Sequence, residues 1–295
     1  MAAQVREVTG SGPAGACFYN LCLWIGKCIA LDLARRNAHV ILACRDKEKG
    51  QAALDEIRRA TGNPSMRLRL LDVSSMASVR DFARQFLKEE SRLDILVNNA
   101  GITGLPVAPT AEDLEQMFAT NVLGPFLLTS LLLDTVKASA PARIVNVSSF
   151  VHCKGTVNIR FLTGEEWPKS CTQAYYSSKL MNVVFTIELA SPIHCPFSRP
   201  PHSPSLHTLH SVHILLEAGP PELEVRPDQF RSAEEGATST LYCAVSREVE
   251  GITGKYFDSD CSLVLPADRA QDPGIARKLW DALEQLTGLR DGGTK

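Results

Sequence analysis

The sequence predicts a doubly wound α/β fold, in which a parallel sheet is covered by helices on both faces. Apolar runs rich in β-branched residues recur along the chain, and charged stretches of helical length separate them. Runs that are apolar at every position are typical of parallel strands, because both faces of such a sheet are buried. With 295 residues, 44% of them hydrophobic, the chain can form one large core, so we expect a single domain spanning 1–295.

The expected elements alternate along the first half of the chain. Residues 4–8 make a poor first strand, because two charges fall where a central strand is normally buried. The long helix that begins near residue 111 has Thr110 as its expected N-cap. The further strands are expected at 38–43, 66–73, 93–98 and 142–148, and the helices at 47–60, 76–90 and 111–138.

Residues 191–221 interrupt this alternation, since they hold seven prolines and five of the seven histidines. His207, His210 and His213 recur at three-residue spacing, which would suit metal ligands. No cysteine or carboxylate cluster accompanies them, so an irregular loop is the favoured interpretation and no metal site is predicted. Regular structure is expected to resume with a helix at 232–245, a strand at 255–265 and a final helix at 267–286.

Composition and charge narrow the class of protein. A formal net charge of −2 provides no basic surface, so no nucleic-acid partner is expected. The nine cysteines include no C-x-x-C pair and are expected to be free thiols in a reducing compartment. The first eight residues do not resemble a signal peptide or anchor, and the apolar run 14–25 is too short to span a bilayer. The expectation is an intracellular, cytoplasmic protein without a membrane span.

Tyr175 and Lys179 are the residues with the clearest chemistry. They lie four positions apart at the start of an expected helix, so they share one helix face. A phenol has a pKa of about 10, which is too high for efficient proton transfer near neutrality. An ammonium one turn away stabilises the phenolate and lowers that pKa. A chance pair on a surface helix has the same spacing, so the pair gains weight only from its neighbours.

Those neighbours lie where expected strands end, which is where ligands bind in this fold class. Asn98-Asn99-Ala100-Gly101 follows one strand, and its small residues allow a ligand to approach the backbone. Ser148-Ser149 ends the next strand, and Asp72 ends an earlier one. Asn121 falls inside a helix, either as a functional amide or as a polar residue tolerated on a solvated turn.

Taken in order, these residues resemble the short-chain dehydrogenase/reductase superfamily, which has a Rossmann-type fold. The resemblance covers nearly the whole chain and is sharpest to its retinol dehydrogenase branch, although the N-terminal membrane anchor usual in that branch is not expected in this chain. The motifs that carry it are LDVS at 71–74, NNAG at 98–101, NVLGPF at 121–126, RIVNVSS at 143–149 and Y-x-x-x-K at 175–179.

The resemblance implies a role for each residue. Tyr175 would exchange a proton with the substrate oxygen, and Lys179 would lower the pKa of Tyr175 and hold the nicotinamide ribose. Ser149 would donate a hydrogen bond to the substrate carbonyl, and Asn121 would order a water in the proton relay. The residues expected to line the cofactor are Gly10, Ile25, Gly26, Arg45, Asp72, Val73, Asn98, Ala100 and Gly101, together with Tyr175 and Lys179.

Cofactor choice follows from the end of the second expected strand, Ala43-Cys44-Arg45. An acid at that place binds the ribose 2′-hydroxyl of NAD and repels the 2′-phosphate of NADP. Here a guanidinium takes the place of the acid and suits a phosphate, so NADP is favoured. Arg45 could instead be a solvated loop charge, but the missing acid indicates the same cofactor.

The opening glycines pose a problem for cofactor binding. Residues 10–15 match G-x-G-x-x-G, yet the following helix and strand fit the family register only when counted from Gly26. Residues 11–24 therefore hold about ten residues more than the family pattern. The extra residues could loop out and leave Gly10 and Gly26 near a pyrophosphate. Alternatively, 16–24 could extend the helix, with Gly12 and Gly15 forming the turn.

Three functions compete. The first is an NADP-dependent oxidoreductase that interconverts retinol-like or other lipophilic alcohols and their carbonyls, with a homo-oligomer left open. The second is a catalytically impaired variant with weak cofactor binding, which the long opening segment and the missing P-G turn and strand after Ala190 favour. The third is a binding protein that docks a partner on Phe18, Leu21 and their apolar neighbours. Such side chains are more often buried in the protein's own hydrophobic core. The complete set of Asn121, Ser149, Tyr175 and Lys179 favours the enzyme.

Overall fold

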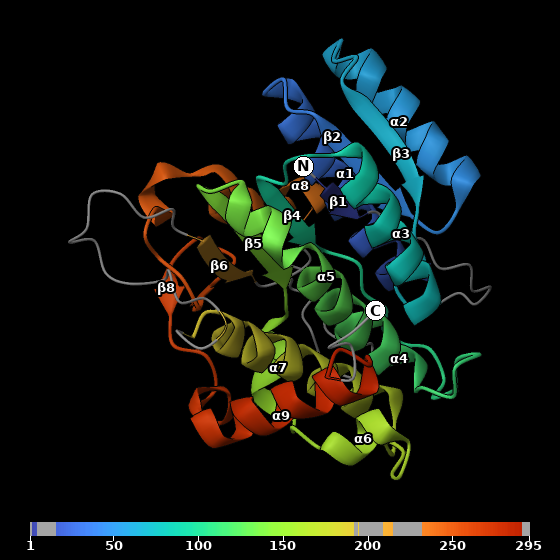
Figure 1. The fold of residues 1–295 in the computed structure, drawn as a ribbon, viewed down its shortest axis with the longest axis vertical. Helices are drawn as coiled ribbons and strands as arrows, with labels where there is room; N and C mark the ends of the chain where they lie inside the picture. The colour runs from blue at the N-terminus through green and yellow to red at the C-terminus, as the bar shows by residue number, and fades with distance from the viewer. Residues whose placement is uncertain (1, 5–15, 192–193, 195–208, 215–231, 291–295) are drawn as a thin grey trace.

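The computed structural model describes residues 2–4, 16–191, 194, 209–214 and 232–290, with the backbone alone described at 2–4, 16–24 and 209–214. Its central feature is an eight-stranded sheet with the order β3-β2-β1-β4-β5-β6-β7-β8, in which only β8 runs antiparallel (Figure 1). This order confirms the doubly wound α/β fold. The strands are β1 (Ala2–Gln4), β2 (Val40–Cys44), β3 (Met66–Leu70), β4 (Ile95–Asn98), β5 (Ala142–Val147), β6 (Leu209–Ile214), β7 (Lys255–Phe257) and β8 (Leu263–Val264).

Helices cover both faces of the sheet, and each face has its own apolar core (Figure 1). Helices α3, α5, α7 and α9 cover one face, and α1, α2 and α8 cover the other. Neighbouring strand residues enter opposite cores, as Ile41 and Leu42 do in β2. The helices are α1 (Ala16–Arg35), α2 (Lys47–Thr61), α3 (Met76–Glu89), α4 (Gln116–Phe118), α5 (Gly124–Ala138), α6 (Ile159–Thr163), α7 (Cys171–Leu189), α8 (Ala233–Val245) and α9 (Pro273–Leu286).

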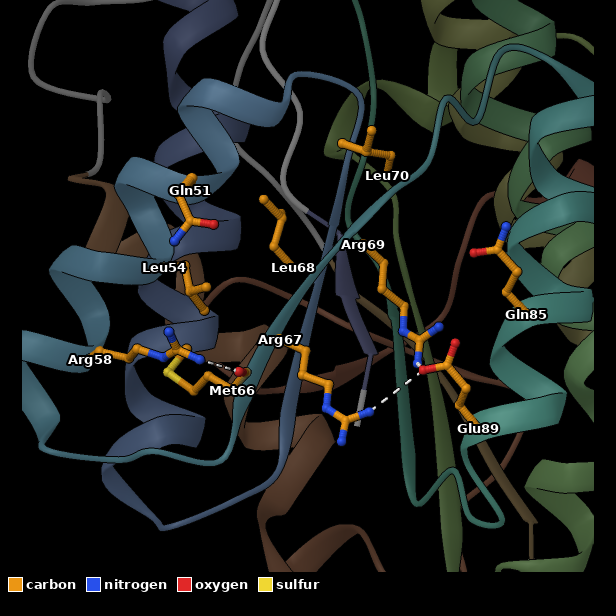
Figure 2. Close-up of a pocket in the computed structure, with 10 residues that line it drawn as sticks. All are labelled: Gln51, Leu54, Arg58, Met66, Arg67, Leu68, Arg69, Leu70, Gln85 and Glu89. Atoms are coloured by element: carbon orange, nitrogen blue, oxygen red, sulfur yellow. Dashed lines mark hydrogen bonds and ion pairs between the residues drawn. The ribbon is translucent and has the colours of Figure 1, made fainter.

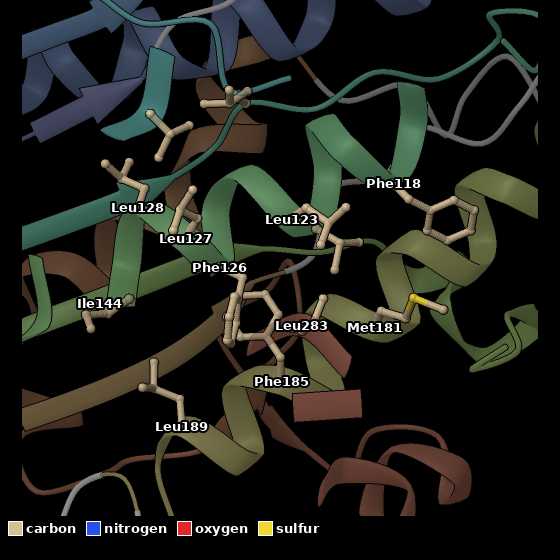
Figure 3. Close-up of a cluster of buried hydrophobic side chains, with 14 of the residues drawn as sticks. Phe118, Leu123, Phe126, Leu127, Leu128, Ile144, Met181, Phe185, Leu189 and Leu283 are labelled. Carbon is tan, nitrogen blue, oxygen red and sulfur yellow. The ribbon is translucent and has the colours of Figure 1, made fainter. Parts of the chain in front are cut away.

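The core beneath α5, α7 and α9 is the aromatic one. Figure 3 shows Phe126 of α5 and Phe185 of α7 packed against each other, with Leu283 of α9 beside them. The two rings meet edge to face at 5.9 Å between centroids, and Trp280 of α9 meets Phe126 at 4.9 Å. This packing holds α7, the helix that carries Tyr175 and Lys179, against α5.

Strand β6 corrects one expectation. Residues 191–221 were expected to be irregular throughout and to leave the sheet one strand short, yet Leu209–Ile214 pairs in parallel with β5 on one side and β7 on the other. The order L-H-S-V-H-I alternates apolar and polar residues through most of its length, but the surrounding prolines obscured it. The first strand also differs, since β1 covers Ala2–Gln4 and pairs with β2 and β4.

The expected helix 111–138 is divided into three parts. Helix α4 begins only at Gln116, a π-helical turn follows at Ala119–Leu123, and α5 then continues. Thr110 is not its N-cap: its hydroxyl accepts hydrogen bonds from the amides of Glu112 and Leu114 in the preceding turn. Glu115 caps α4 instead by accepting from the two amides that follow, and burial raises the pKa of its carboxyl.

The stretch Gln116–Ala138 is also, among the described residues, the one helical segment long and apolar enough to cross a membrane. Since 78% of its most apolar window is buried inside the fold, packing accounts for its composition.

The C-terminal third follows the expected order with shorter elements. Helix α8 begins with a capping box in which Ser232 and Glu235 exchange hydrogen bonds. The strand expected at 255–265 is a hairpin of β7 and β8, because the chain turns at Cys261, which has a φ of 70°. The final helix starts at Pro273 after a 3-10 turn at Asp268–Gln271. Among the described cysteines, Cys44 and Cys243 are buried free thiols.

Candidate active site

Tyr175 and Lys179 lie in the first turns of α7, which begins after the N-cap Ser170. Both side chains are buried, with exposed fractions of 3% and 2%. The Nζ atom of Lys179 lies 5.7 Å from the centroid of the Tyr175 ring and donates a hydrogen bond of 3.1 Å to the carbonyl of Val147. An ammonium is therefore held between a phenol ring and the end of β5.

Ser148 and Ser149 follow β5 and have different tasks. The Ser148 hydroxyl donates to the carbonyl of Lys179 at 2.8 Å, which ties the end of β5 to α7. Ser149 is fully buried, and its carbonyl accepts the backbone amide of His152 at 3.0 Å. Ser149, which the sequence singled out at the end of this strand, is thus buried there, but the tie made by Ser148 was not apparent from the sequence.

Asn121 lies in the π-helical turn and is 1% exposed, so its interpretation as a tolerated polar residue on a solvated turn is wrong. Its Oδ1 accepts from the amide of Ile102 at 2.8 Å. Its Nδ2 donates to the carbonyl of Ile102 and to the hydroxyl of Ser178, both at 3.0 Å. Asn121 thereby connects the loop after β4 to α7. Such π-helical turns occur frequently at functional sites.

Gly101 shows how closely these groups approach one another. A Cβ atom on Gly101 would lie 3.3 Å from Nζ of Lys179 and 3.5 Å from Oδ1 of Asn121. The loop after β4, the π-helical turn and α7 thus meet at one place. Ala100 lies beside it and is 7% exposed. Three separate segments that the sequence singled out are brought together here.

Asn98, one of the residues expected to line the cofactor, directs its side chain into the interior. Its Nδ2 donates to Thr129 at 2.9 Å and to Asn146 at 2.7 Å. Asn146 in turn donates to Thr186 of α7 at 2.6 Å. This buried polar chain links β4, β5, α5 and α7, so the Asn98 side chain is a structural group.

Arg45 and Asp72 lie at the ends of β2 and β3, with 3.8 Å between Nη1 and Oδ2. Their side chains are 40% and 30% exposed, so both reach the protein surface. Asp72 also accepts from the amide and hydroxyl of Ser74 at 3.0 and 2.6 Å. Val73 is buried against Gly124 of α5.

The opening segment gives a mixed result. Gly10 lies outside the described residues. Ile25 and Gly26, two of the residues expected to line the cofactor, lie well inside α1, which already begins at Ala16. Beyond the first turn of a helix the backbone amides bond within it, so the Gly26 amide cannot hold a pyrophosphate. Of the two arrangements considered, helix extension through 16–24 is the one observed.

A cavity of about 680 Å³ lies elsewhere, at the outer edge of β3 between α2 and α3 (Figure 2). None of its lining residues belongs to the site described above. Its guanidinium groups have partners: Arg58 donates to the carbonyl of Met66, and Arg69 pairs with Glu89 at 2.8 Å. This cavity is not part of the candidate active site.

His152 is a further buried group near the site, and its position three residues after Ser149 was the only sequence signal for it. Burial lowers the pKa of its imidazole, while a hydrogen bond with Ser149 and the charge of Asp258 oppose that shift. The ring also lies 4.8 Å from the ring of Tyr256.

Protonation of His152 is expected to destabilise the fold in mild acid. In the unfolded chain this group titrates near its usual pKa of about 6.5, whereas in the folded chain it holds its proton less well. The unfolded state then binds more protons as the pH falls below that value, so the free energy of unfolding falls from pH 7 towards pH 5. One such group contributes at most about 1.4 kcal/mol per pH unit. Urea denaturation at several pH values gives the free energy of unfolding as a function of pH. Between pH 7 and pH 5 this free energy should fall less steeply for His152→Asn than for the wild type. An equally steep fall would contradict this assignment.

Known proteins match this chain in both sequence and fold. A family model described as short chain dehydrogenase matches residues 24–193. The chain is 40% identical to retinol dehydrogenase 13 of Mus musculus over 275 residues, which cover 90% of this chain and 81% of that protein. It is 40% identical to retinol dehydrogenase 11 of Homo sapiens over 278 residues, covering 90% and 83%. It is 38% identical to dehydrogenase/reductase SDR family member 13 of Homo sapiens over 275 residues, covering 91% and 71%.

Solved structures share the fold. A crystal structure of an uncharacterized protein from Mycobacterium paratuberculosis aligns with a TM-score of 0.73 at 31% identity, covering 97% of this chain and 93% of that one. A short chain dehydrogenase from Shigella flexneri 2a str. 301, solved in complex with NADP, aligns with a TM-score of 0.61 at 21% identity, covering 88% and 96%. The second likeness concerns the fold alone.

Proposed function

The chain belongs to the short-chain dehydrogenase family and is related to retinol dehydrogenases, which makes it an oxidoreductase of the alcohol and carbonyl type; from this premise we propose that it uses NADP and acts on lipophilic substrates. One observation carries the proposal: Gly101, Asn121 and Lys179 meet at one place beside the Tyr175 ring. Because its relatives bear the name retinol dehydrogenase, retinol and retinal are the first substrate pair to test.

A nicotinamide cofactor fits the part of the site built by Gly101 and Lys179. Glycine leaves the space beside Nζ without a side chain, and an added Cβ would lie 3.3 Å from that atom. An ammonium carries three protons, so it can serve the carbonyl of Val147 and also a ribose hydroxyl. When bound, the nicotinamide exchanges a hydride with the substrate carbon. Ala100 and Gly101 would line the same half of the cofactor.

The proton chemistry belongs to the chain's own residues. In the direction of reduction, the Tyr175 hydroxyl gives its proton to the substrate oxygen and becomes a phenolate beside Lys179. A neighbouring cation favours that charged form. The Ser149 hydroxyl would donate a hydrogen bond to the same substrate oxygen, and Asn121 would hold the water that returns the proton. Oxidation of the alcohol uses the same groups in reverse.

Preference for NADP rests on Arg45, because an arginine and not an acid directly follows Cys44, the last residue of β2, and its guanidinium stays partly exposed beside Asp72. We expect Arg45→Ala to raise the Kd for NADPH by about tenfold and to leave the Kd for NADH within a factor of about 2, since only NADPH carries the phosphate. Fluorescence titration of both cofactors measures this. Arg84→Ala, an exposed arginine of α3 paired with Asp81, is the control and should change neither value. Equal weakening of both cofactors by Arg45→Ala would argue against a phosphate contact.

The function itself is tested by incubating the purified protein with NADPH and retinal, and with NADP and retinol, while following absorbance of the reduced cofactor. Saturable turnover by the wild-type chain supports the proposal. If the folded protein binds NADPH but turns over neither retinoid, the substrate class is wrong while the cofactor assignment stands.

A catalytically impaired protein is the second candidate, favoured by the placement of Gly26 inside α1. In this case Tyr175 and its neighbours keep their arrangement, but the pyrophosphate lacks its usual turn. The absence of saturable NADPH binding by a protein with a cooperative unfolding transition would decide for this candidate.

A further inference from the structure

The segment that leads from Ser149 to α7 is fastened at several points. Gly155 packs directly against the backbone of Tyr176. A Cβ atom added to Gly155 would lie 2.8 Å from the carbonyl carbon of Tyr176 and 2.9 Å from Cβ of Leu180. The amide of Thr156 donates to the hydroxyl of Ser177 at 3.2 Å. The position of Ser149 relative to the catalytic helix therefore depends on how this segment is held.

His152 makes two hydrogen bonds from within that segment, one with each ring nitrogen. Nδ1 lies 2.8 Å from the carbonyl oxygen of Ser149, and a carbonyl can only accept, so Nδ1 carries a proton. Nε2 lies 3.2 Å from the backbone amide of Ala267, and an amide can only donate, so Nε2 carries none. The two contacts together require the neutral ring with its proton on Nδ1.

Ala267 opens the short 3-10 turn that precedes α9. A second tie joins the same two segments, because Arg269 donates to the carbonyl of Gly155 at 3.0 Å. The ring of Tyr256 lies against the imidazole, and Asp258 is the charged group that favours its protonation. The imidazole of His152 thus bridges the residue at the end of β5 that bears the predicted catalytic hydroxyl and the turn that precedes α9.

We propose that His152 is a positioning residue for Ser149: its protonated Nδ1 holds the Ser149 carbonyl, and its Nε2 anchors the ring to the amide of Ala267. The consequence for catalysis rests on the proposed function, because Ser149 is there the hydrogen-bond donor to the substrate oxygen. A small displacement of such a donor lowers the rate of the chemical step more than it weakens binding.

Three variants separate the two contacts. His152→Phe keeps a ring beside Tyr256 but makes neither hydrogen bond. His152→Asn places an amide nitrogen near the former Nδ1 and keeps the contact with Ser149. His152→Gln places its amide near the former Nε2 and keeps the contact with Ala267.

Steady-state kinetics should show a fall in kcat of about tenfold or more for His152→Phe, with KM changed by less than about threefold. His152→Asn should recover more of kcat than His152→Gln, even where the two variants melt at the same temperature. A purely structural role would make kcat follow the melting temperature instead. Wild-type kcat in His152→Phe, or better recovery by His152→Gln, would overturn the proposal.

Nuclear magnetic resonance tests the two contacts of His152 without any measurement of enzyme activity. The ¹⁵N spectrum of the imidazole, assigned by its loss in His152→Asn, should show the neutral ring protonated at Nδ1 at pH 7. The carbonyl carbon of Ser149, detected through the amide of Phe150, should shift upfield in His152→Phe and stay closer to its wild-type position in His152→Asn. A ring protonated at Nε2, or an unmoved carbonyl signal, would overturn the proposal. If the wild type shows no turnover, the proposed function fails while these spectra still decide the role of His152.

Discussion

Replacing Tyr175 with phenylalanine is expected to lower kcat/KM by about a thousandfold. The change removes one hydroxyl and keeps the ring, which is 3% exposed and lies 5.7 Å from the Lys179 ammonium. General acid–base groups contribute roughly 10² to 10⁴ in rate, and no other phenol is placed beside this ammonium in the described structure. The Kd for NADPH should change little, because the ammonium and Gly101 remain in place.

Steady-state kinetics at saturating NADPH, together with a fluorescence titration, measure both quantities. Tyr176→Phe is the matched control, because it removes the same hydroxyl from the next residue of α7, whose ring faces Lys154. It should retain kcat/KM within a factor of about 3. A Tyr175→Phe protein that keeps a tenth or more of the wild-type activity would remove Tyr175 from the proton transfer.

The second large effect is expected from Gly124→Ala, which should lower the free energy of unfolding by about 2 to 3 kcal/mol. An added Cβ would lie 2.9 Å from the carbonyl carbon of Val73 and closer still to its oxygen, so backbone would meet backbone. Neither the Val73 backbone nor the new Cβ atom can rotate away from this contact. Helix α5 must therefore shift outward from the end of β3. Alanine forms helices better than glycine by about 1 kcal/mol, so intrinsic propensity alone predicts the opposite sign.

Urea denaturation followed by circular dichroism measures this change. Gly274→Ala in α9 is the control, because the atom nearest to its Cβ would be a side-chain atom and not backbone: Oδ1 of the N-cap Asp272, at 3.1 Å. That variant should stay within about 0.5 kcal/mol of the wild type. A Gly124→Ala protein that is as stable as the wild type would show that the approach of α5 to Val73 is looser than described.

The sequence predicted most of the sheet and most helices, because each of these depends on local patterns. Hydrophobic periodicity marks β2 to β5, and side-chain caps such as Asp46 and Ser75 begin α2 and α3 near the expected positions. The spacing of Tyr175 and Lys179 fixes their common face. These features need only neighbours within a few residues.

Other features depend on tertiary partners and could not be predicted in this way. Thr110 is a good N-cap by type, but Pro109 forms a bridge with Glu115 that delays the helix. The buried partners of the Asn98 side chain, Thr129 on α5 and Asn146 on β5, are not apparent from the motif that contains Asn98. Strand β6 forms because its backbone pairs with β5 on one side and with β7 on the other. This pairing outweighs the effect of the prolines in the surrounding sequence. The role of His152 depends on Ala267, which lies 115 residues away.

Strand β3 is the outer strand of the sheet on its side, so among the described strands none pairs with its outer edge. Arg67 and Arg69 lie two positions apart in β3 and form ion pairs with Glu89 and Glu90. These pairs place charges beside a strand edge that could otherwise pair with another strand. A strand from another molecule would have to dehydrate these charges before it could add to the sheet. The arginines therefore contribute to resistance against aggregation, a property of concentrated solutions that is independent of how stably a single molecule folds.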